Sequence, residues 1–177
     1  MRGCVFDVPR GAGHDGGMDG EVRIGDRPGD AGGVVALHGR VYGAEYGLDV
    51  RMEGYVAIGL GEWLTEEPKG PGRLWVVDCG GAVVASVGLT ARSAEVGRLR
   101  WFVVDPAWRG NGLGRRLLYC ALAFAREAGY QRIVLDTFSE LRSAARMYRA
   151  AGFERTEWWT ESLWGREIER EGYELVL

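Results

Sequence analysis

The sequence predicts an α/β domain in which helices cover a mixed sheet. Two observations support this prediction. After residue 72, the apolar pattern changes from helical spacing to short strand-like runs. A strand–helix–strand unit then follows a hairpin, which adds a parallel connection to antiparallel neighbours. The expected element order is β-α-α-β-β-β-α-β-α-β-β, with no internal repeat and no second domain.

Length and composition fit one domain with a substantial core. The chain has 177 residues, 46% of them hydrophobic, and a net charge of −3. This small, mixed charge argues against a nucleic-acid or membrane-surface partner. Three cysteines and two histidines make a disulfide framework or a metal site a poor expectation, and they favour a reducing cytoplasm. No apolar run reaches the roughly 20 residues that span a membrane.

Residues 1–20 are rich in glycine and lack a continuous apolar stretch. We expect a flexible N-terminal leader there rather than a signal peptide. Patterned sequence begins just after Met18, which suggests that this methionine is the true start. Residues 21–177 are expected to form the folded domain.

The first half of the domain is expected to hold a short strand and two helices. The strand is predicted at residues 21–25, and the turn after it ends at Asp30, the expected helix N-cap. Residues 31–47 have helical apolar spacing that glycines weaken. A second helix is predicted at residues 50–66. Its expected inward positions are Met52, Tyr55, Val56, Ile58, Leu60 and Leu64.

The second half is expected to alternate strands with two further helices. Gly80 and Gly81 predict a hairpin turn, and Pro106 ends a strand because proline cannot donate to the ladder. Glycines are also expected to close both helices. Strands are predicted at residues 73–78, 82–89, 98–104 and 131–138 and in two runs within 153–177. Helices are predicted at residues 112–128 and 141–151.

A glycine-rich turn joins the strand at 98–104 to the helix at 112–128. Glycines let the backbone approach a phosphate closely, and a helix N-terminus contributes about half a positive charge. Arg109, Arg115 and Arg116 add full charges nearby. The turn lacks the GxGxxG of a Rossmann fold and the Gly-Lys-Ser/Thr of a P-loop. On glycine content alone, an anion cradle and an ordinary tight turn both remain open.

The turn resembles the acyl-CoA-binding signature of GNAT-superfamily N-acetyltransferases, Arg/Gln-x-x-Gly-x-Gly/Ala, which Arg109, Gly112 and Gly114 fill. The helix at 141–151 is similar to the family's A-x-x-x-Y-x-x-x-G-F pattern, with Tyr148 in register. The resemblance implies the acyl-CoA N-acyltransferase fold, a mixed and mostly antiparallel central sheet flanked by helices.

A closer resemblance is to the acetyltransferase portion of bacterial winged-helix regulator–acetyltransferase fusions. It is carried by the Arg100-Trp101-Phe102 strand and by the helix that contains His38, Tyr42 and Glu45. This chain has no room for a winged helix.

The resemblance implies acetyl-CoA as the co-substrate and no metal. The backbone of Phe102, Val103 and Val104 is expected to pair with the pantetheine arm, with a free N–H near Val104 for the thioester oxygen. Leu141 stands where many family members have an asparagine that contacts the cofactor. The pyrophosphate is expected at Arg109, Gly110, Asn111, Gly112, Leu113, Gly114 and Arg115.

The resemblance makes Tyr148 the general acid that protonates the departing thiolate; the alternative is a core tyrosine. The general base is left open by the sequence. Asp136 lies within an apolar strand, and burial raises the pKa of a carboxyl, so it is one candidate. A structural salt bridge between Asp136 and an arginine is the alternative. Glu45 and a chain of water molecules are the other candidates for the base.

Residues of the acceptor site are expected on the first helix, where His38, Tyr42, Glu45 and Tyr46 share one side. In the family this region borders the acceptor; an ordinary amphipathic helix is the alternative. Arg100 is expected either to pair with an acceptor carboxylate or to be a strand-edge charge. Three tryptophans fit core filling, a dimer interface or a wall for an apolar acceptor: Trp158, Trp159 and Trp164.

The function implied by the resemblance is a cytoplasmic N-acetyltransferase. It moves an acetyl group from acetyl-CoA to a primary amine of a small molecule or amino acid by direct attack. A protein N-acetyltransferase and a non-catalytic acyl-CoA sensor are the alternatives. The expected partners are the amine and a second copy of the chain in a homodimer. The sequence leaves open the acceptor, the acyl length, the base and the oligomeric state.

Overall fold

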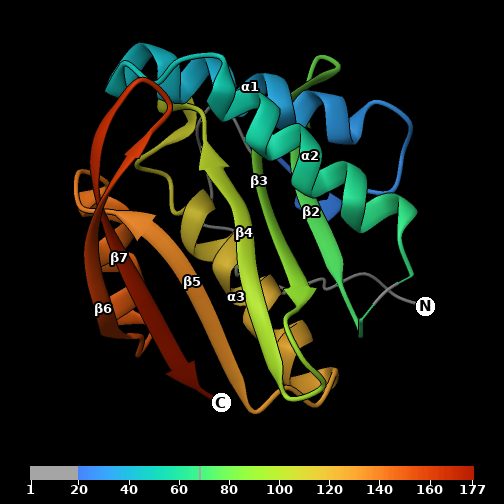
Figure 1. Cartoon of the computed structure of the whole chain (residues 1–177). Coiled ribbons are helices and arrows are strands. Elements are labelled where there is room, and N and C mark those ends of the chain that lie inside the picture. Colours follow the sequence, from blue (N-terminus) through green and yellow to red (C-terminus); the bar gives the residue numbers. More distant parts are fainter. Residues whose placement is uncertain (1–19, 68) are drawn as a thin grey trace.

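One sheet of seven strands runs through residues 20–67 and 69–177, the part of the chain that the computed structural model describes. Its order is β1-β2-β3-β4-β5-β7-β6, and β4 with β5 is the parallel pair among its antiparallel neighbours. Helices α1 and α2 cover one face, and α3 lies against the other (Figure 1).

The predicted elements are all present, and the ends of those up to α4 lie within two residues of the predicted ones; the last strand, predicted at residues 173–177, begins earlier, at Arg166. The strands are β1 (Arg23–Ile24), β2 (Arg73–Cys79), β3 (Ala82–Ala91), β4 (Val96–Val104), β5 (Arg132–Phe138), β6 (Glu154–Leu163) and β7 (Arg166–Val176). The helices are α1 (Asp30–Tyr46), α2 (Arg51–Thr65), the short 3-10 helix η1 (Pro106–Trp108), α3 (Leu113–Glu127) and α4 (Arg142–Ala150). The mixed, mostly antiparallel sheet flanked by helices is thereby confirmed. The predicted leader at 1–20 and the start at Met18 lie outside the described residues, except for Gly20.

Two local predictions are wrong. The N-cap of α1 is Gly29, with φ at 98°, whereas Asp30 lies inside the helix and accepts hydrogen bonds from Arg23. The second error is the inward face of α2, where Tyr55 and two aliphatic residues are exposed by 43–64%. The buried stripe of α2 consists of Met52, Val56, Gly59 and Leu60. Because α2 has apolar residues on more than one side, periodicity alone did not identify the packed face.

Alternating side chains divide the core into two clusters on opposite faces of the sheet. In β2, Leu74 and Val76 pack under α1 and α2, whereas Trp75 and Val77 pack against α3. This alternation follows from the two-residue period of a strand. Both faces are therefore fully covered along the middle of the sheet.

A bulge in β4 reverses this alternation. Leu99 faces the α3 side, yet Trp101, two residues later, faces the α1 side. The pairing with β3 shifts between Ser86 and Gly88, and Trp101 has φ at 49°, in the left-handed region. One extra residue on a strand changes which face its later side chains occupy. The bulge thereby sets the direction of every group in the second half of β4.

The parallel pairing of β4 with β5 is short. It joins residues 96–98 of β4 to residues 132–134 of β5 and then stops. Beyond this point β4 follows β3 and β5 follows β7, so the two halves of the sheet spread apart (Figure 1). The separation leaves the end of β4 without a neighbouring strand on its β5 side.

The bulge predicts a stability cost at Gly88. A methyl group on Gly88 would lie 2.4 Å from Cε3 of Trp101, and an indole ring in a packed core has little room to move. We expect Gly88→Ala to lower the free energy of unfolding by about 1–3 kcal/mol in urea denaturation. Gly32→Ala is the control, because Gly32 lies in α1 with no atom within 4 Å of the added methyl group. Equal stability of Gly88→Ala and wild type would contradict the packing described for the bulge.

Candidate functional site

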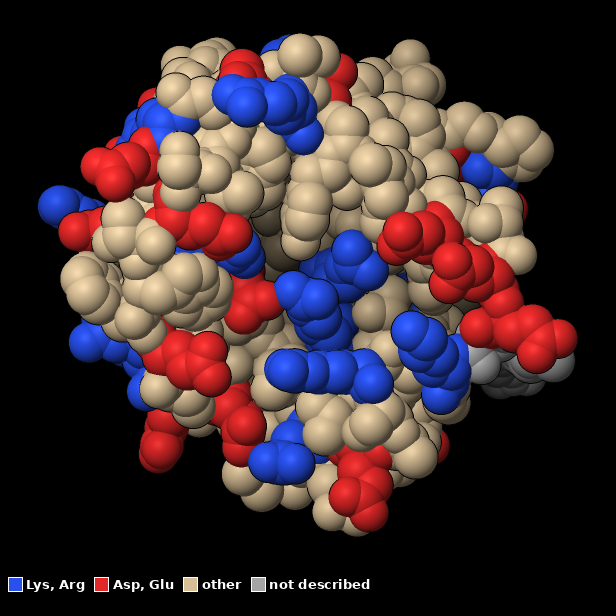
Figure 2. Space-filling view, in the orientation of Figure 1, with Lys and Arg blue, Asp and Glu red and all other residues tan. Residues whose placement is uncertain are grey.

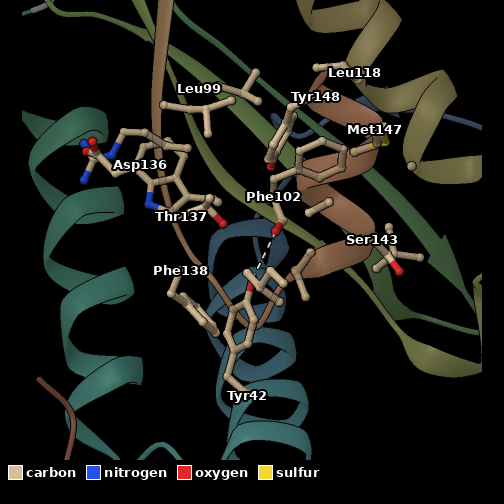
Figure 3. A pocket seen from close by; sticks show the side chains of 18 of the residues that line it. Tyr42, Leu99, Phe102, Leu118, Asp136, Thr137, Phe138, Ser143, Met147 and Tyr148 are labelled. Atoms are coloured by element: carbon tan, nitrogen blue, oxygen red, sulfur yellow. Dashed lines mark hydrogen bonds between the residues drawn. The ribbon is translucent and has the colours of Figure 1, made fainter. Parts of the chain in front are cut away.

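A cleft of about 930 Å³ opens where β4 and β5 separate. Its lining comes from α1, α2, β4, β5, the turn before α3, and α4. Tyr42 of α1 and Tyr148 of α4 approach Phe102 of β4 from opposite sides (Figure 3). Elements far apart in the sequence therefore meet at the exposed end of one strand.

The backbone of β4 presents polar groups to the cleft. The Asp105 N–H donates to Val84 O in β3, so alternation turns the main-chain groups of Phe102 and Val104 away from β3. The carbonyl of Phe102 accepts from the Tyr42 hydroxyl at 3.3 Å, and the carbonyl of Val104 accepts from Arg109 Nε at 3.0 Å. The N–H groups of these two residues face the cleft. They form an edge on which an extended ligand can pair as an added strand does.

The turn between β4 and α3 is open and rich in donors. Gly110 and Gly112 have φ at 85° and 76°, and a methyl group placed on either would have no atom within 4 Å. Gly112 is the N-cap of α3, with no side-chain hydrogen bond, and Arg116 N makes the first bond of the helix, to Gly112 O. The N–H groups of residues 113–115 thus lack helical acceptors. An exposed helix N-terminus of this kind fits a phosphate group.

Arg109 is held in place by two contacts. Its Nε donates to Val104 O, and its guanidinium forms an ion pair with Glu45 at 2.8 Å. Arg40, which precedes Glu45 in α1, forms an ion pair with Asp105 at 2.9 Å. The last turns of α1 are therefore tied to the start of the glycine turn. Glu45, a candidate base in the sequence, is not among the residues that line the cleft.

Tyr148 lies on the inner side of α4 and is 5% exposed. Its ring lies 6.1 Å from that of Phe102 and 6.0 Å from that of Tyr173, measured between centroids. Burial raises the pKa of this phenol, and the nearby phenols of Tyr42 and Tyr173 raise it further. Its hydroxyl makes no hydrogen bond to any described residue, and it is not sealed from the cleft. Tyr148 is thus a protonated donor next to the free edge of β4.

A line of aromatic rings along α1 bridges the two halves of the sheet. His38, Tyr42 and Tyr46 follow one another with centroid distances of 5.6 and 5.8 Å. Phe138, at the end of β5, lies 5.7 Å from Tyr42 and 5.4 Å from Tyr46. Since Tyr42 also donates to β4, this cluster links both strands where they are farthest from pairing. The structure places three of the four predicted α1 residues on the cleft, all but Glu45.

His38 is buried and neutral. It is 2% exposed, and its Nδ1 donates to Val34 O at 2.8 Å, because a carbonyl can only accept. Burial lowers the pKa of this imidazole to about 4, and the bond to Val34 offsets only part of that effect. His38 therefore remains neutral at pH 7.

Asp136 is exposed on the cleft rather than buried, which corrects the burial on which its candidacy as a base was argued. Its carboxylate forms an ion pair with Arg98 at 2.5 Å. This pair joins Arg98, in the last paired position of β4, to Asp136, two residues beyond the last paired position of β5. The salt bridge with an arginine, the alternative left open by the sequence, is confirmed. The carboxylate still lines the cleft.

The three C-terminal tryptophans do not form one patch. Trp158 is 58% exposed, and Trp159 stacks under Arg170 at 5.1 Å. Trp164, in the turn between β6 and β7, packs on Tyr55 of α2 with a centroid distance of 5.3 Å. Its carbonyl accepts from Asp49 N at 3.0 Å, so the β6–β7 turn closes against the α1–α2 loop. Trp164 alone of the three lines the cleft.

The cleft brings together most of the predicted site residues. Two predicted site residues do not line the cleft: Glu45, and Asn111, which is exposed. Sequence reasoning missed several lining residues: Met52, Tyr55, Arg98, Trp101, Thr137, Ser143 and Met147. Arg98 had a usable signal, a charge two residues before Arg100 on the same strand. Tyr55 and Ser143 belong to no recognisable motif, and only the tertiary fold places them.

Positive charge surrounds the cleft. Arginine side chains border the hollow in the middle of the face in Figure 2. The lining has two carboxylates, Asp136 and Glu140, against seven arginines: Arg98, Arg100, Arg109, Arg115, Arg142, Arg146 and Arg170. Such a surface attracts an anionic ligand.

Two classes of feature are not found in the described part of the chain. Residues 20–67 and 69–177 contain no group of three or more His, Cys, Asp or Glu side chains placed to hold a metal ion. No helix within these residues combines the length and apolarity needed to cross a membrane.

Comparison with known proteins gives a consistent result. The model of the acetyltransferase (GNAT) family matches residues 44–153. YjgM of Escherichia coli K12, an uncharacterized N-acetyltransferase, is 34% identical over 123 residues, covering 67% of this chain and 74% of YjgM. The mouse probable N-acetyltransferase family 8 member 5 is 37% identical over 95 residues, or 51% of this chain and 42% of that protein. The chain thus matches less than half the length of the mouse relative.

A solved structure shares the fold at lower identity. The yncA protein of Salmonella typhimurium, determined with its cofactor acetyl-CoA, superposes with a TM-score of 0.68. The match covers 90% of this chain and 94% of that chain at 18% identity.

The buried imidazole predicts a pH effect on stability. The pKa of His38 is about 4 in the folded state and 6.5 when unfolded, so the unfolded chain binds more protons as the pH falls below 6.5. Between pH 7.5 and pH 5, we expect His38 to cost wild type about 2 kcal/mol of unfolding free energy. His38→Gln should lose about 2 kcal/mol less over the same range, because glutamine does not titrate. Urea denaturation at both pH values measures this; an equal loss in both proteins would contradict the assignment.

Proposed function

The chain belongs to the GNAT acetyltransferase family, and we propose that it transfers an acetyl group from acetyl-CoA to the primary amine of a small molecule. Membership makes it an acyl-CoA-dependent N-acyltransferase. The observation that supports the proposal best is the free edge of β4, which lies between an open helix N-terminus and the Tyr148 hydroxyl. This arrangement has a place for a diphosphate, an extended arm and a leaving thiolate in one continuous cleft.

The open groups of the turn and the strand fit the coenzyme. The N–H groups of residues 113–115 and the Arg115 side chain would hold the diphosphate. The free N–H groups of Phe102 and Val104 would bind the pantetheine arm, and one of them would donate to the thioester oxygen as that oxygen gains charge. Acetyl-CoA supplies the activated acetyl group when bound. Glu45 would keep Arg109 in position through their ion pair.

Two side chains of the cleft, Tyr148 and Asp136, would transfer the protons. Tyr148 retains its proton at neutral pH because its pKa is raised by burial, so it would donate to the departing sulfur. The attacking amine must lose a proton, because a free alkylamine has a pKa near 10. Of the two carboxylates considered as bases, only Asp136 lines the cleft. It would receive the proton, directly or through water.

The closed acceptor end favours a small molecule over a protein substrate. The contact of Trp164 with Tyr55 and the hydrogen bond from Asp49 join the β6–β7 turn to α2 and the α1–α2 loop. A protein acetyltransferase needs an open groove to admit a polypeptide. The contacts seen here close one side of the space beyond β4 instead.

Tyr148 gives the first test of the proposal. We expect Tyr148→Phe to lower kcat for thiol release from acetyl-CoA by roughly 100-fold or more, because the departing thiolate loses its acid. The affinity for CoA, measured by calorimetry, should stay the same. Tyr130→Phe is the control, since Tyr130 bonds to Pro71 O outside the cleft. A Tyr148→Phe enzyme within twofold of wild type would exclude this role. Tight CoA binding without turnover of any amine would indicate a sensor.

Two neighbouring arginines of α3 provide a matched test of the phosphate site. Arg115 lines the cleft and Arg116 does not, although both are exposed in the first turn of the helix. We expect Arg115→Ala to weaken CoA binding by roughly 3- to 10-fold, with a smaller salt dependence. Arg116→Ala should remain within twofold of wild type. Equal effects of the two changes in calorimetry would mean that general surface charge, rather than this site, attracts the coenzyme.

A further inference from the structure

Arg100 is a cation without a carboxylate partner at the acceptor end of the cleft. Within the described residues it forms no ion pair, whereas Arg98 pairs with Asp136 and Arg170 pairs with Glu161. Its guanidinium lies over the ring of Trp101 at 4.5 Å. Burial lowers the pKa of Arg100, and the charge of Arg98 lowers it further. Leaving a desolvated charge unpaired is costly, so the free protein maintains an unfavourable arrangement here.

A donor without a partner lies beside it. Trp101 Nε1 is the one side-chain nitrogen or oxygen in the described residues that is both buried and without a hydrogen-bond partner. A methyl group on Gly59 of α2 would lie 2.3 Å from Arg100 Nη2 and 3.6 Å from Trp101 Nε1. The Arg100 guanidinium therefore packs against α2 in the space that is available because residue 59 has no side chain. Buried polar groups are rarely left unsatisfied without a reason.

The position of these donors separates them from the coenzyme site. Arg100 precedes the bulge in β4, whereas the open edge at Phe102 and Val104 and the glycine turn follow it. The Tyr55 hydroxyl of α2 contacts Arg100 through a side-chain hydrogen bond, and the charge of Glu62 attracts it, but the Glu62 carboxylate forms no salt bridge with it. The surrounding lining is apolar and aromatic: Met52, Tyr55, Val56, Trp101 and Trp164.

We propose that Arg100, stacked on Trp101 and accommodated by Gly59, binds a carboxylate of the acceptor, so that the substrate is an amino acid rather than a simple amine. This inference rests on the proposed function. A carboxylate supplies the negative charge that Arg100 lacks, and a guanidinium binds it in bidentate geometry. The aromatic lining accommodates an apolar or aromatic side chain. Asp136, the proposed base, lines the same cleft as Arg100.

Matched pairs of acceptors test the proposal directly. Phenylalanine and tryptophan are compared with 2-phenylethylamine and tryptamine, which lack only the carboxylate. We expect kcat/KM for thiol release to be roughly 10- to 100-fold higher with the amino acids, because a site built for a charged group rejects an analogue that leaves it unpaired. Equal or better turnover of the decarboxylated amines would overturn the proposal while leaving the acetyltransferase function intact.

Variants identify the residue that binds the carboxylate. In Arg100→Met the preference for the amino acid should fall to about twofold or less, and Arg100→Lys should retain part of it because the charge remains. Gly59→Ala should reduce the preference, since the added methyl group would lie 2.3 Å from Arg100 Nη2 and displace the guanidinium. Gly61→Ala is its control in the same helix, because there the added methyl group has no atom within 4 Å. A preference that survives Arg100→Met would overturn the assignment.

Binding of the products tests the same site without turnover. Calorimetry on the CoA-loaded protein compares N-acetyltryptophan with N-acetyltryptamine. We expect roughly tenfold tighter binding of the acid in wild type and no such difference in Arg100→Met. If no amine is acetylated but this difference is present, the proposed activity fails and the carboxylate site stands. If the two products bind equally to wild type, the carboxylate site is wrong.

Discussion

The site depends on the early end of one strand pairing. β4 and β5 are parallel neighbours over three residue pairs, after which each follows a different partner. If their ladder continued to Val104, the backbone edge at Phe102 and Val104 would be occupied by β5, and no cleft would exist. Interrupted pairing is normally a liability, because unpaired strand groups must find other partners. Here Tyr42 and Arg109 bond to two of the exposed carbonyls, and the N–H groups remain available.

The bulge at Trp101 and the aromatic cluster of α1 keep this opening in one shape. The bulge turns Trp101 toward α1 and α2 while Phe102 faces Tyr148. Tyr42 and Tyr46 then fill the wide end of the opening and contact Phe138 of β5. A positive φ at a tryptophan costs conformational energy, and such strain persists only where the surrounding structure holds it. Trp63 and Gly88 pack against the Trp101 ring and supply that support.

The sequence predicted the elements well because their signals are local. Glycines at 112, 129 and 152 mark helix ends, and the strands carry strong apolar runs. The coenzyme half of the site could also be predicted from the sequence, since the turn at 109–115 is one contiguous segment and its expected contacts are mainly with the backbone. The acceptor half was predicted only in part: residues of α1 and Arg100 were expected there, whereas Tyr55 and Arg98 come from separate elements and were missed. The burial of Asp136 was misjudged for the same reason: an apolar strand does not reveal that its neighbour departs after residue 134.

A crystal structure of the protein with CoA tests the central claim most directly. The account requires the pantetheine arm to run along Phe102 to Val104 on the side vacated by β5. It also requires the diphosphate to accept hydrogen bonds from the main-chain N–H groups of residues 113–115. Coenzyme bound elsewhere, or a strand edge that closes onto β5 when the coenzyme is present, would contradict the claim that interrupted pairing creates the site.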